Sequence, residues 1–400
     1  MKYRLLGRSG LRVSELGLGC GTIGTNWGPL GADQGESFRI LEHFAEAGGN
    51  FLDTSNRYQE SQSEQWIGEF IHRDRDRFVI GTKFSLGDGA EDFNGVGKHT
   101  SPSDPNNRGN HRKNLRRSVE GSLKRLKTDY IDLLWLHIWD YTTPFDEIVQ
   151  SVNDLVREGK VLYAGLSSVP AWEVTRMNAY ADFHGLAPFV ALQNEWSLVE
   201  RSHEPEYLPM CKALDLAVVC WSPLAGGMVS GKYNQLPLAE GMPHRLLPHV
   251  QNSNEFWYPT TQRNLQIMER LIPRFHQIGE PPTAIALRWL MQQAEVVSIP
   301  IFSVRTLDQL KQAMRATSFT LSSEDMAAIN TITKSAIAPP VAEYGAYPYP
   351  MLEFGSPALP NFYSRALLYG ETENKIVNHR KPVPYKYMPC LLYTSPSPRD

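Results

Sequence analysis

Four side chains that can hold or move a proton lie close to the ends of short apolar runs. Asp53, Lys83 and His137 each end such a run, and Tyr58 lies just beyond Asp53. Each residue taken alone has a commoner structural explanation, such as a helix cap for the carboxylate or core packing for the tyrosine. All four lie at or just after the ends of successive apolar runs, in this order along the chain. This arrangement indicates a catalytic group instead.

The types of these residues suit the donation of a proton. A free tyrosine, with a pKa of about 10, is a slow acid at neutral pH. A neighbouring ammonium favours the tyrosinate, so Lys83 would lower the pKa of Tyr58 towards the working range. A buried lysine needs a partner, and Asp53 would keep Lys83 charged and oriented.

The elements that must position these groups alternate along the chain. From Leu16 to about Thr317, short apolar runs alternate with amphipathic helical patterns. Several runs are continuously apolar, as in strands that are covered on both faces. Eight such units predict an α/β fold, a (β/α)8 TIM barrel, with an open doubly wound sheet as the alternative. The expected strands are Leu16–Gly19, Asn50–Thr54, Phe78–Lys83, Tyr130–His137, Val161–Ser167, Phe189–Gln193, Leu216–Trp221 and Val296–Pro300.

The chain also contains segments that do not follow this alternation. Residues 3–13 predict an N-terminal β-hairpin that caps one barrel mouth, and the Gly/Pro/His-rich residues 224–260 predict a binding loop. We expect one barrel domain over residues 1–335 and an irregular, proline-rich C-terminal extension over residues 336–389. Residues 390–400 match the in-frame translation of a transposase-type sequencing adapter, so we expect a non-native tail there.

Composition excludes several classes of partner. A net charge of −3, with scattered basic residues, gives no general attraction to nucleic acid or anionic lipid. No stretch reaches the ~18 apolar residues of a membrane span, and the N-terminus lacks the apolar block of a signal peptide. The four cysteines (Cys20, Cys211, Cys220 and Cys390) have no paired spacing, so we expect no disulfide framework, no metal site and a reducing cytoplasmic location.

Six motifs, in order along the chain, resemble those of the aldo-keto reductase family. They cover roughly residues 3–335. The resemblance implies reduction of an aldehyde or ketone to the alcohol by hydride transfer from NADPH, with Tyr58 as the proton donor and His137 hydrogen-bonded to the substrate carbonyl. The motifs are Phe51–Tyr58, Val79–Lys83, Asp129–His137, Gly159–Ser167, Trp221–Gly227 with Gly231–Tyr233, and Ile299–Thr306.

The resemblance also implies where the cofactor binds. Ser167 and Gln193 would contact the nicotinamide carboxamide, and Trp196 would stack on the ring. Arg305 would face the adenosine 2′-phosphate, which favours NADPH over NADH through a charge-assisted contact, and Gln309 would reach adenine. The full set of implied cofactor contacts is Thr22, Ser167, Ser168, Gln193, Trp196, Ser222, Leu224, Gly226, Lys232, Ser303, Arg305 and Gln309.

Tryptophans are expected to line the substrate pocket. Trp27 and Trp139 fall in mouth loops, and aromatic walls suit apolar aldehydes, ketones or sugar rings equally. Ser303, Ser168 and Ala313 depart from the residues common in the family, which bears on affinity for the cofactor more than on the chemistry. The substrate beyond a small carbonyl compound, and the oligomeric state, do not follow from the sequence.

Two alternatives from other classes stay open at this point. A cofactor-binding regulatory or scaffold subunit could use the same barrel with little turnover, because the family includes channel-associated subunits. A metal-dependent barrel hydrolase would need His, Asp or Glu ligands at several strand ends. Only Asp53 and His137 qualify, and Lys83 lies beside them.

Overall fold

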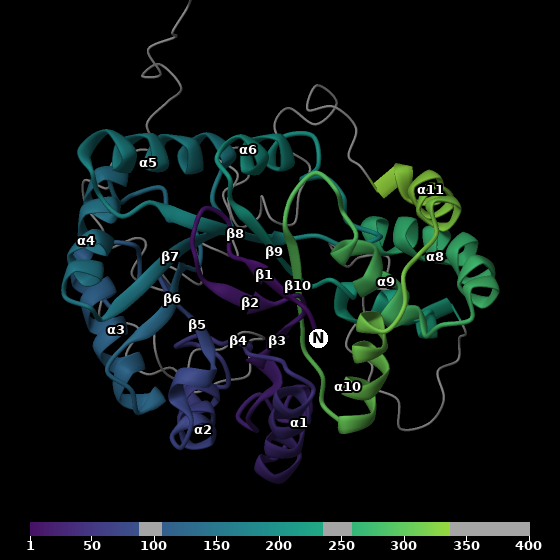
Figure 1. Ribbon diagram of the computed structural model, residues 1–400, viewed down its shortest axis with the longest axis horizontal. Coiled ribbons are helices and arrows are strands. Elements are labelled where there is room, and N and C mark those ends of the chain that lie inside the picture. Colours follow the sequence, from purple (N-terminus) through teal and green to yellow (C-terminus); the bar gives the residue numbers. More distant parts are fainter. Residues whose placement is uncertain (88–105, 235–257, 337–400) are drawn as a thin grey trace, which may run out of the picture.

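The structure, a computed structural model, describes residues 1–87, 106–234 and 258–336. Its first residues form a hairpin, and the rest of the described chain alternates strands with helices (Figure 1). The expected C-terminal extension, apart from its first residue, and the adapter-like tail lie outside the described residues. Most of the expected binding loop, residues 224–260, also lies outside the described residues.

Eight parallel strands of the described residues close into one barrel, in the order β10-β3-β4-β5-β6-β7-β8-β9. The prediction of a (β/α)8 TIM barrel is therefore confirmed, and all eight expected strands occur within a few residues of their expected ends. The strands are β3 (Gly17–Gly19), β4 (Phe51–Asp53), β5 (Val79–Phe84), β6 (Ile131–Leu136), β7 (Val161–Ser167), β8 (Phe189–Glu195), β9 (Ala217–Trp221) and β10 (Ser298–Phe302).

Helices surround this barrel (Figure 1). Their ends follow local chemistry: the Asp33 side chain accepts from the backbone N–H of Glu36 at the start of α1, and Gly185, with φ of 62°, ends α5. The helices are α1 (Gln34–Glu46), α2 (Gln62–Ile71), α3 (Arg112–Leu126), α4 (Phe145–Arg157), α5 (Ala171–His184), α6 (Tyr207–Ala213), α8 (Tyr258–Ile278), α9 (Pro282–Met291), α10 (Leu307–Met314) and α11 (Ser323–Ile332).

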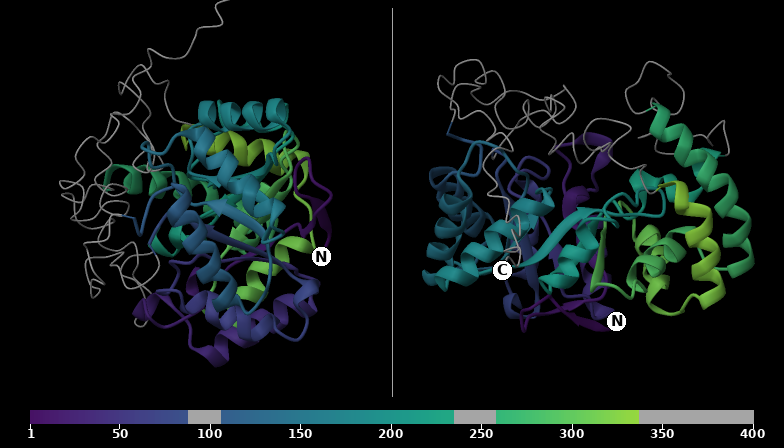
Figure 2. Two further views of the ribbon diagram at one scale, coloured as in Figure 1. Left: turned by 90° about the vertical axis from the view of Figure 1, so that its left-hand side faces the viewer. Right: turned by 90° about the horizontal axis from the view of Figure 1, so that it is seen from above.

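The expected N-terminal hairpin is present and lies at the end of the barrel where the strands begin. Strands β1 (Tyr3–Leu5) and β2 (Arg12–Ser14) pair antiparallel. The Arg8 N–H donates to the Asp215 carbonyl just before β9, at 2.7 Å. In both views of Figure 2 the N-terminus lies at the edge of the molecule. The hairpin thus closes the end of the barrel opposite to the strand ends that carry chemistry.

The strands bury both faces, because helices cover the outside and side chains fill the inside. In most strands alternate residues point inwards, whereas β8, whose register shifts against β7, contributes the neighbouring residues Val190 and Ala191 to the interior. The N-terminal hairpin adds two apolar side chains, Leu6 and Val13, at the end of the barrel where the strands begin. The interior cluster consists of Leu6, Val13, Phe51, Val79, Leu133, Trp135, Val190, Ala191, Ala217, Val219, Ile299 and Ile301.

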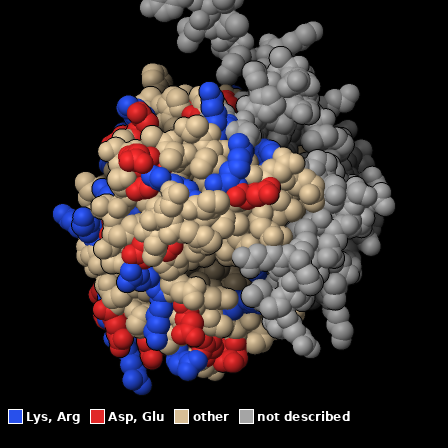
Figure 3. Space-filling model, turned by 90° about the vertical axis from the view of Figure 1, so that its right-hand side faces the viewer, with Lys and Arg blue, Asp and Glu red and all other residues tan. Residues whose placement is uncertain are grey.

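The outer surface carries charges of both signs. On the face that carries α8 and α11, acidic and basic side chains are interspersed (Figure 3). Arg274 of α8 pairs with Asp325 of α11 at 2.7 Å. Among the helices of the described residues, none is long and apolar enough to cross a membrane.

Candidate active site

The structure brings the four predicted catalytic side chains together at the open end of the barrel. Asp53 ends β4, Lys83 lies near the end of β5 and His137 follows β6, all on inward-facing positions. The Lys83 ammonium forms an ion pair with Asp53 and donates to the Thr54 carbonyl at 2.7 Å. It lies 4.7 Å from the centroid of the Tyr58 ring. The rings of Tyr58 and His137 meet edge to face, with centroids 5.9 Å apart.

The loop after β4 holds Tyr58 in a defined position. The Gln59 side chain donates to the Gly21 carbonyl at 2.9 Å and accepts from the backbone N–H of Trp27 at 2.8 Å. Three consecutive residues, 59–61, have positive φ, an unusual backbone conformation that the surrounding bonds must stabilise. The Trp27 indole lies edge to face with Tyr58, at 6.0 Å between centroids.

Asp53 and Lys83 form a buried ion pair in which each charge supports the other. Burial raises the pKa of the Asp53 carboxyl overall, and the Lys83 charge, followed by hydrogen bonds from Lys83 and Gln193 and by the Trp135 indole, opposes this rise only in part. Burial lowers the pKa of Lys83, but the charges of Asp53 and Tyr58 outweigh it, so that the pKa of the ammonium is raised overall. Lys83 is therefore a fixed positive charge beside Tyr58.

Tyr58 and His137 are held in their neutral forms. Burial raises the pKa of Tyr58, and the Lys83 charge only partly opposes this, so the pKa is raised overall. The expectation of a net lowering of that pKa is therefore wrong, because desolvation outweighs the ammonium. Burial, followed by the charges of Lys83 and Arg57, lowers the pKa of His137 well below its ordinary value. His137 is then neutral, and its Nδ1 lies 3.5 Å from the Ser55 hydroxyl.

Two of the implied nicotinamide contacts are neighbours at the mouth. Ser167 of β7 and Gln193 of β8 occupy paired register positions, and both side chains are buried. The Gln193 amide donates to Oδ2 of Asp53 at 2.9 Å. Gln193 thus connects the Asp53 carboxylate to the strands expected to hold the nicotinamide, through a hydrogen bond between residues far apart in sequence. Ser168 follows with a positive φ of 52°.

The structure corrects the expectation for Trp196. Only 1% of this residue is exposed, its indole donates to Glu204 at 3.0 Å, and its ring packs edge-on against Trp289 of α9. It therefore has no face open to a ligand. Sequence reasoning missed Trp221, the last residue of β9, which is half-buried against the interior cluster on the same face of the strand as Val219. The alternation along β9 could have identified it.

The loop after β9 bends sharply towards the mouth. Ser222, Ala225, Gly226 and Gly227 all have positive φ, which glycine adopts without strain. A methyl group at Gly227 would lie 3.4 Å from Nζ of Lys232, so the ammonium covers this turn. Leu224, Gly226 and Ser222 are all half-buried.

The loop after β10 approaches from the other side. Arg305 donates from Nη1 to the Pro29 carbonyl at 2.7 Å, and its backbone N–H donates to Gln309 Oε1 at 2.9 Å. Burial lowers the pKa of Lys232, and the charge of Arg305 adds to this effect, so the two cations act on one region. Thr22 donates to the Val304 carbonyl at 2.6 Å, and Ser303 is exposed beside the β3 strand.

The two expected pocket tryptophans differ in their surroundings. Trp27 is half-buried and lies against Tyr58, as described above. Trp139 is 4% exposed and belongs to the core between strands and helices, edge to face with Tyr141 at 6.3 Å. Trp27 therefore contacts Tyr58, whereas Trp139 packs in the core beside the loop after β6.

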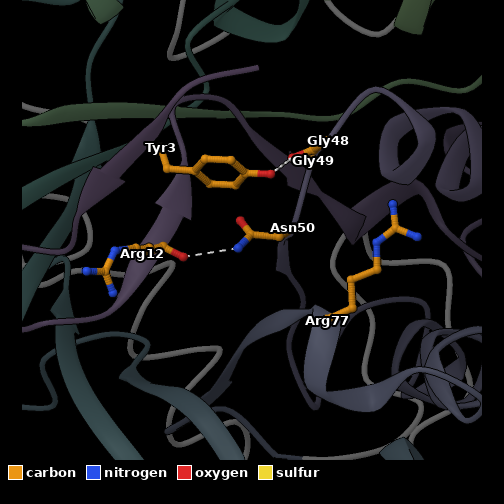
Figure 4. Close-up of a pocket in the computed structure, with 6 residues that line it drawn as sticks. All are labelled: Tyr3, Arg12, Gly48, Gly49, Asn50 and Arg77. Carbon is orange, nitrogen blue, oxygen red and sulfur yellow. Dashed lines mark hydrogen bonds between the residues drawn. The ribbon is translucent and has the colours of Figure 1, made fainter.

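One hollow of the described residues lies at the closed end of the barrel. A cavity of about 290 Å³ is lined by Tyr3, Arg12, Gly48, Gly49, Asn50 and Arg77, at the closed end beside the hairpin. Figure 4 shows Tyr3 bonded to Gly48 and Asn50 bonded to the Arg12 backbone, with the two guanidinium groups pointing apart. This cavity is separate from the catalytic group.

A closed parallel barrel with Asp, Tyr, Lys and His at the carboxyl ends of adjacent strands defines the class of oxidoreductase barrels that handle carbonyl groups. The model of the aldo/keto reductase family matches residues 15–334. The chain belongs to this family and is an oxidoreductase.

Named relatives agree with this assignment. The chain is 37% identical to norsolorinic acid reductase of Aspergillus flavus over 333 residues, covering 82% of this chain and 80% of the relative. It is 35% identical to aryl-alcohol dehydrogenase [NADP(+)] of Phanerodontia chrysosporium, covering 80% and 83%. A putative aryl-alcohol dehydrogenase of Saccharomyces cerevisiae is 36% identical, covering 83% and 86%. These similarities support carbonyl reduction with a nicotinamide cofactor.

Proposed function

We propose that this enzyme reduces an aldehyde or ketone to the alcohol with NADPH, and that Tyr58 donates the proton. The observation that carries the proposal is the contact of the buried Lys83 ammonium with Asp53 on one side and Tyr58 on the other. The bound cofactor would supply the hydride to the carbonyl carbon. The Tyr58 hydroxyl gives its proton to the carbonyl oxygen, and the tyrosinate that remains is stabilised by Lys83.

His137 orients the substrate in this proposal. Its lowered pKa keeps the imidazole neutral, so one ring nitrogen carries a proton and can donate to the carbonyl oxygen. The edge-to-face contact with Tyr58 brings both donors to one side of the mouth. A carbonyl oxygen held by His137 is therefore within the same small space as the Tyr58 hydroxyl.

The residues present fit a nicotinamide dinucleotide. Ser167 and Gln193 would hold the carboxamide, and Trp221, in place of Trp196, offers an aromatic face at the mouth. Lys232 and Arg305 bring two positive charges to the loops after β9 and β10, which suits the phosphates of NADPH. A relative named aryl-alcohol dehydrogenase [NADP(+)] supports the choice of the phosphorylated cofactor.

Aryl carbonyl compounds are the substrates we propose to test first. The names of the relatives refer to aryl alcohols and to norsolorinic acid. Trp27 next to Tyr58 provides an aromatic wall that suits a flat apolar ring. Turnover of NADPH should be compared across aryl aldehydes, aliphatic aldehydes, ketones and ketosugars.

The Tyr58→Phe variant tests the proton donor. We expect kcat to fall by orders of magnitude, about 100-fold or more on the scale of general acid catalysis, because no other described side chain at the mouth combines an acidic proton with contact to Lys83. Cofactor binding, followed by quenching of protein fluorescence, should change little, since the cofactor contacts lie on other strands. A Phe variant that turns over an aryl aldehyde at the wild-type rate would show that the catalytic assignment is wrong.

A further inference from the structure

Trp135 is a buried indole inside the barrel that the proposed reaction does not yet use. It lies on β6 two residues before His137, on the same inward face, and is fully buried. Most interior side chains around it are aliphatic, so packing alone would be served by a leucine or isoleucine. An indole at this position also brings a polar N–H into the barrel, and a buried donor without an acceptor is costly.

The neighbouring strands leave space for this ring. Gly165 of β7 is the register partner of Trp135, and a methyl group there would lie 2.3 Å from Cζ3 of the indole. Gly81 of β5 flanks the other edge, where a methyl group would lie 2.9 Å from Nε1. The two glycines thus form a slot, called here the indole slot, which fixes the direction of the N–H group.

The indole slot directs that N–H towards Asp53. The same methyl group at Gly81 would lie 3.1 Å from Oδ2 of Asp53, so Nε1 and Oδ2 border one small gap. Trp135 Nε1 is buried and forms no hydrogen bond of ordinary geometry with a described residue. The indole is also the last and smallest of the groups that oppose the rise in the pKa of this buried carboxyl. Catalytic hydrogen bonds are often long in a free enzyme and shorten when ligands bind.

We propose that Trp135 is a positioning residue for the reaction: its indole N–H donates to Oδ2 of Asp53 and keeps this carboxylate charged and aimed at Lys83. Oδ1 receives Lys83 and Oδ2 receives the Gln193 amide, so Trp135 completes the set of donors around the carboxylate. The inference rests on the catalytic roles proposed above for Asp53, Lys83 and Tyr58. Trp135 itself touches neither the substrate carbonyl nor the proposed proton donor in this scheme.

The Trp135→Phe variant removes the N–H and keeps an aromatic ring in the indole slot. We expect kcat with a good aryl aldehyde to fall about 10-fold, the scale of one hydrogen bond to a charged group. We also expect the acidic limb of the kcat–pH profile to move to higher pH, because a carboxylate that loses a donor is protonated more easily. Cofactor binding should change little.

A matched control separates this role from packing. Trp289 of α9 is also fully buried, and its indole donates to Asn330 at 3.0 Å, away from the barrel interior. Trp289→Phe should lower the melting temperature as much as Trp135→Phe does, or more, without moving the pH profile. If Trp135→Phe gives an unshifted profile, or if both variants change kcat and the profile alike, the positioning role is overturned.

A second substitution guards against a variant that is merely misfolded. Gly165→Ala keeps the indole N–H but narrows the indole slot. We expect it to shift the acidic limb of the kcat–pH profile in the same direction as Trp135→Phe does. The profile is measured on the fraction of the protein that binds cofactor, which is folded. Tyr58→Phe is measured alongside. An active Tyr58→Phe enzyme contradicts the proposed function as a whole, whereas an inactive one together with an unaffected Trp135→Phe enzyme contradicts only the role of Trp135.

Discussion

Two effects act on Tyr58 in opposite directions. Burial raises the pKa of the phenol, and the Lys83 ammonium lowers it, with burial the larger of the two. The phenol therefore keeps its proton until it has an acceptor. In the proposed reaction, Lys83 would stabilise the tyrosinate once the proton has moved, which is the stage at which a charge in a low-dielectric site has its greatest effect.

The direction of this shift gives a pH prediction. In the reducing direction the protonated phenol is required, so kcat should stay level through neutral pH and fall only as the pH rises through the raised pKa of Tyr58. In the oxidising direction the tyrosinate is required, so the rate with an aryl alcohol and NADP+ should rise with pH. Steady-state rates in both directions between pH 6 and 10 check this. A reduction rate that already falls near neutrality contradicts it.

Single residues differ in how far the sequence could reveal them. The meeting of Asp53, Tyr58, Lys83 and His137 at one end of the barrel could be predicted, because residue type and place near a strand end are both visible in the chain. The net pKa of Tyr58 could not, since the extent of burial depends on neighbours contributed by distant strands. Gln193 bonded to Asp53 was likewise invisible, because the two lie on opposite sides of the barrel order.

The loops after β9 and β10 act together, as elements. The first places Lys232 over a glycine turn, and the second anchors Arg305 on the Pro29 carbonyl just ahead of α10. Thr306 caps α10 by accepting from the backbone N–H of Gln309, which fixes the start of this helix. Two cations held by separate loops form one positively charged region.

Arg305→Ala tests whether this region recognises the 2′-phosphate. We expect the Kd for NADPH to increase about 10-fold or more, the scale of a lost charge-assisted contact, and the Kd for NADH to change little. Lys311→Ala is the matched control, because it removes the same charge from an exposed position on α10. Equal weakening of both cofactors by Arg305→Ala, or an equal effect of Lys311→Ala, would rule out the assignment.

Elements were easier to predict from the sequence than the residues that follow them. Short apolar runs that alternate with helical patterns identified all eight barrel strands, and several of these runs are continuous because both faces of the strand are buried. The aromatic expected to face the nicotinamide was placed after β8, although the regular alternation of β9 puts Trp221 at the mouth. Strand ends therefore have to be read together with the alternation inside each strand.

The whole molecule contains histidines that folding keeps uncharged. Burial lowers the pKa of His203 to about 3, and burial followed by two positive charges lowers that of His137 as well. In the unfolded chain both have ordinary values near 6.5. Below that pH the unfolded chain takes up protons that the folded enzyme does not, so stability is lost as the pH falls.

Part of the acid destabilisation can therefore be assigned to His203. Between pH 7 and pH 5, His203 should account for a loss of about 2 kcal/mol in the free energy of unfolding. His203→Asn removes the titrating group, so its urea midpoint should depend less steeply on pH than that of the wild type, whatever its absolute stability. Parallel pH dependences of the two proteins would contradict the assignment.

The hairpin that closes the barrel affects the order in which the barrel can fold during synthesis. Leu6 and Val13 fill the bottom of the interior, and the Arg8 N–H bonds to Asp215, which leaves the ribosome half a chain length later. Because the hairpin is synthesised long before β8 and β9, its apolar side chains stay exposed until those strands exist. Contacts of such long sequence separation slow folding and expose the nascent chain to aggregation. The end of the barrel interior that the hairpin fills is therefore completed only after the later strands have been synthesised, and we expect the apolar residues of the hairpin to be exposed to aggregation until then.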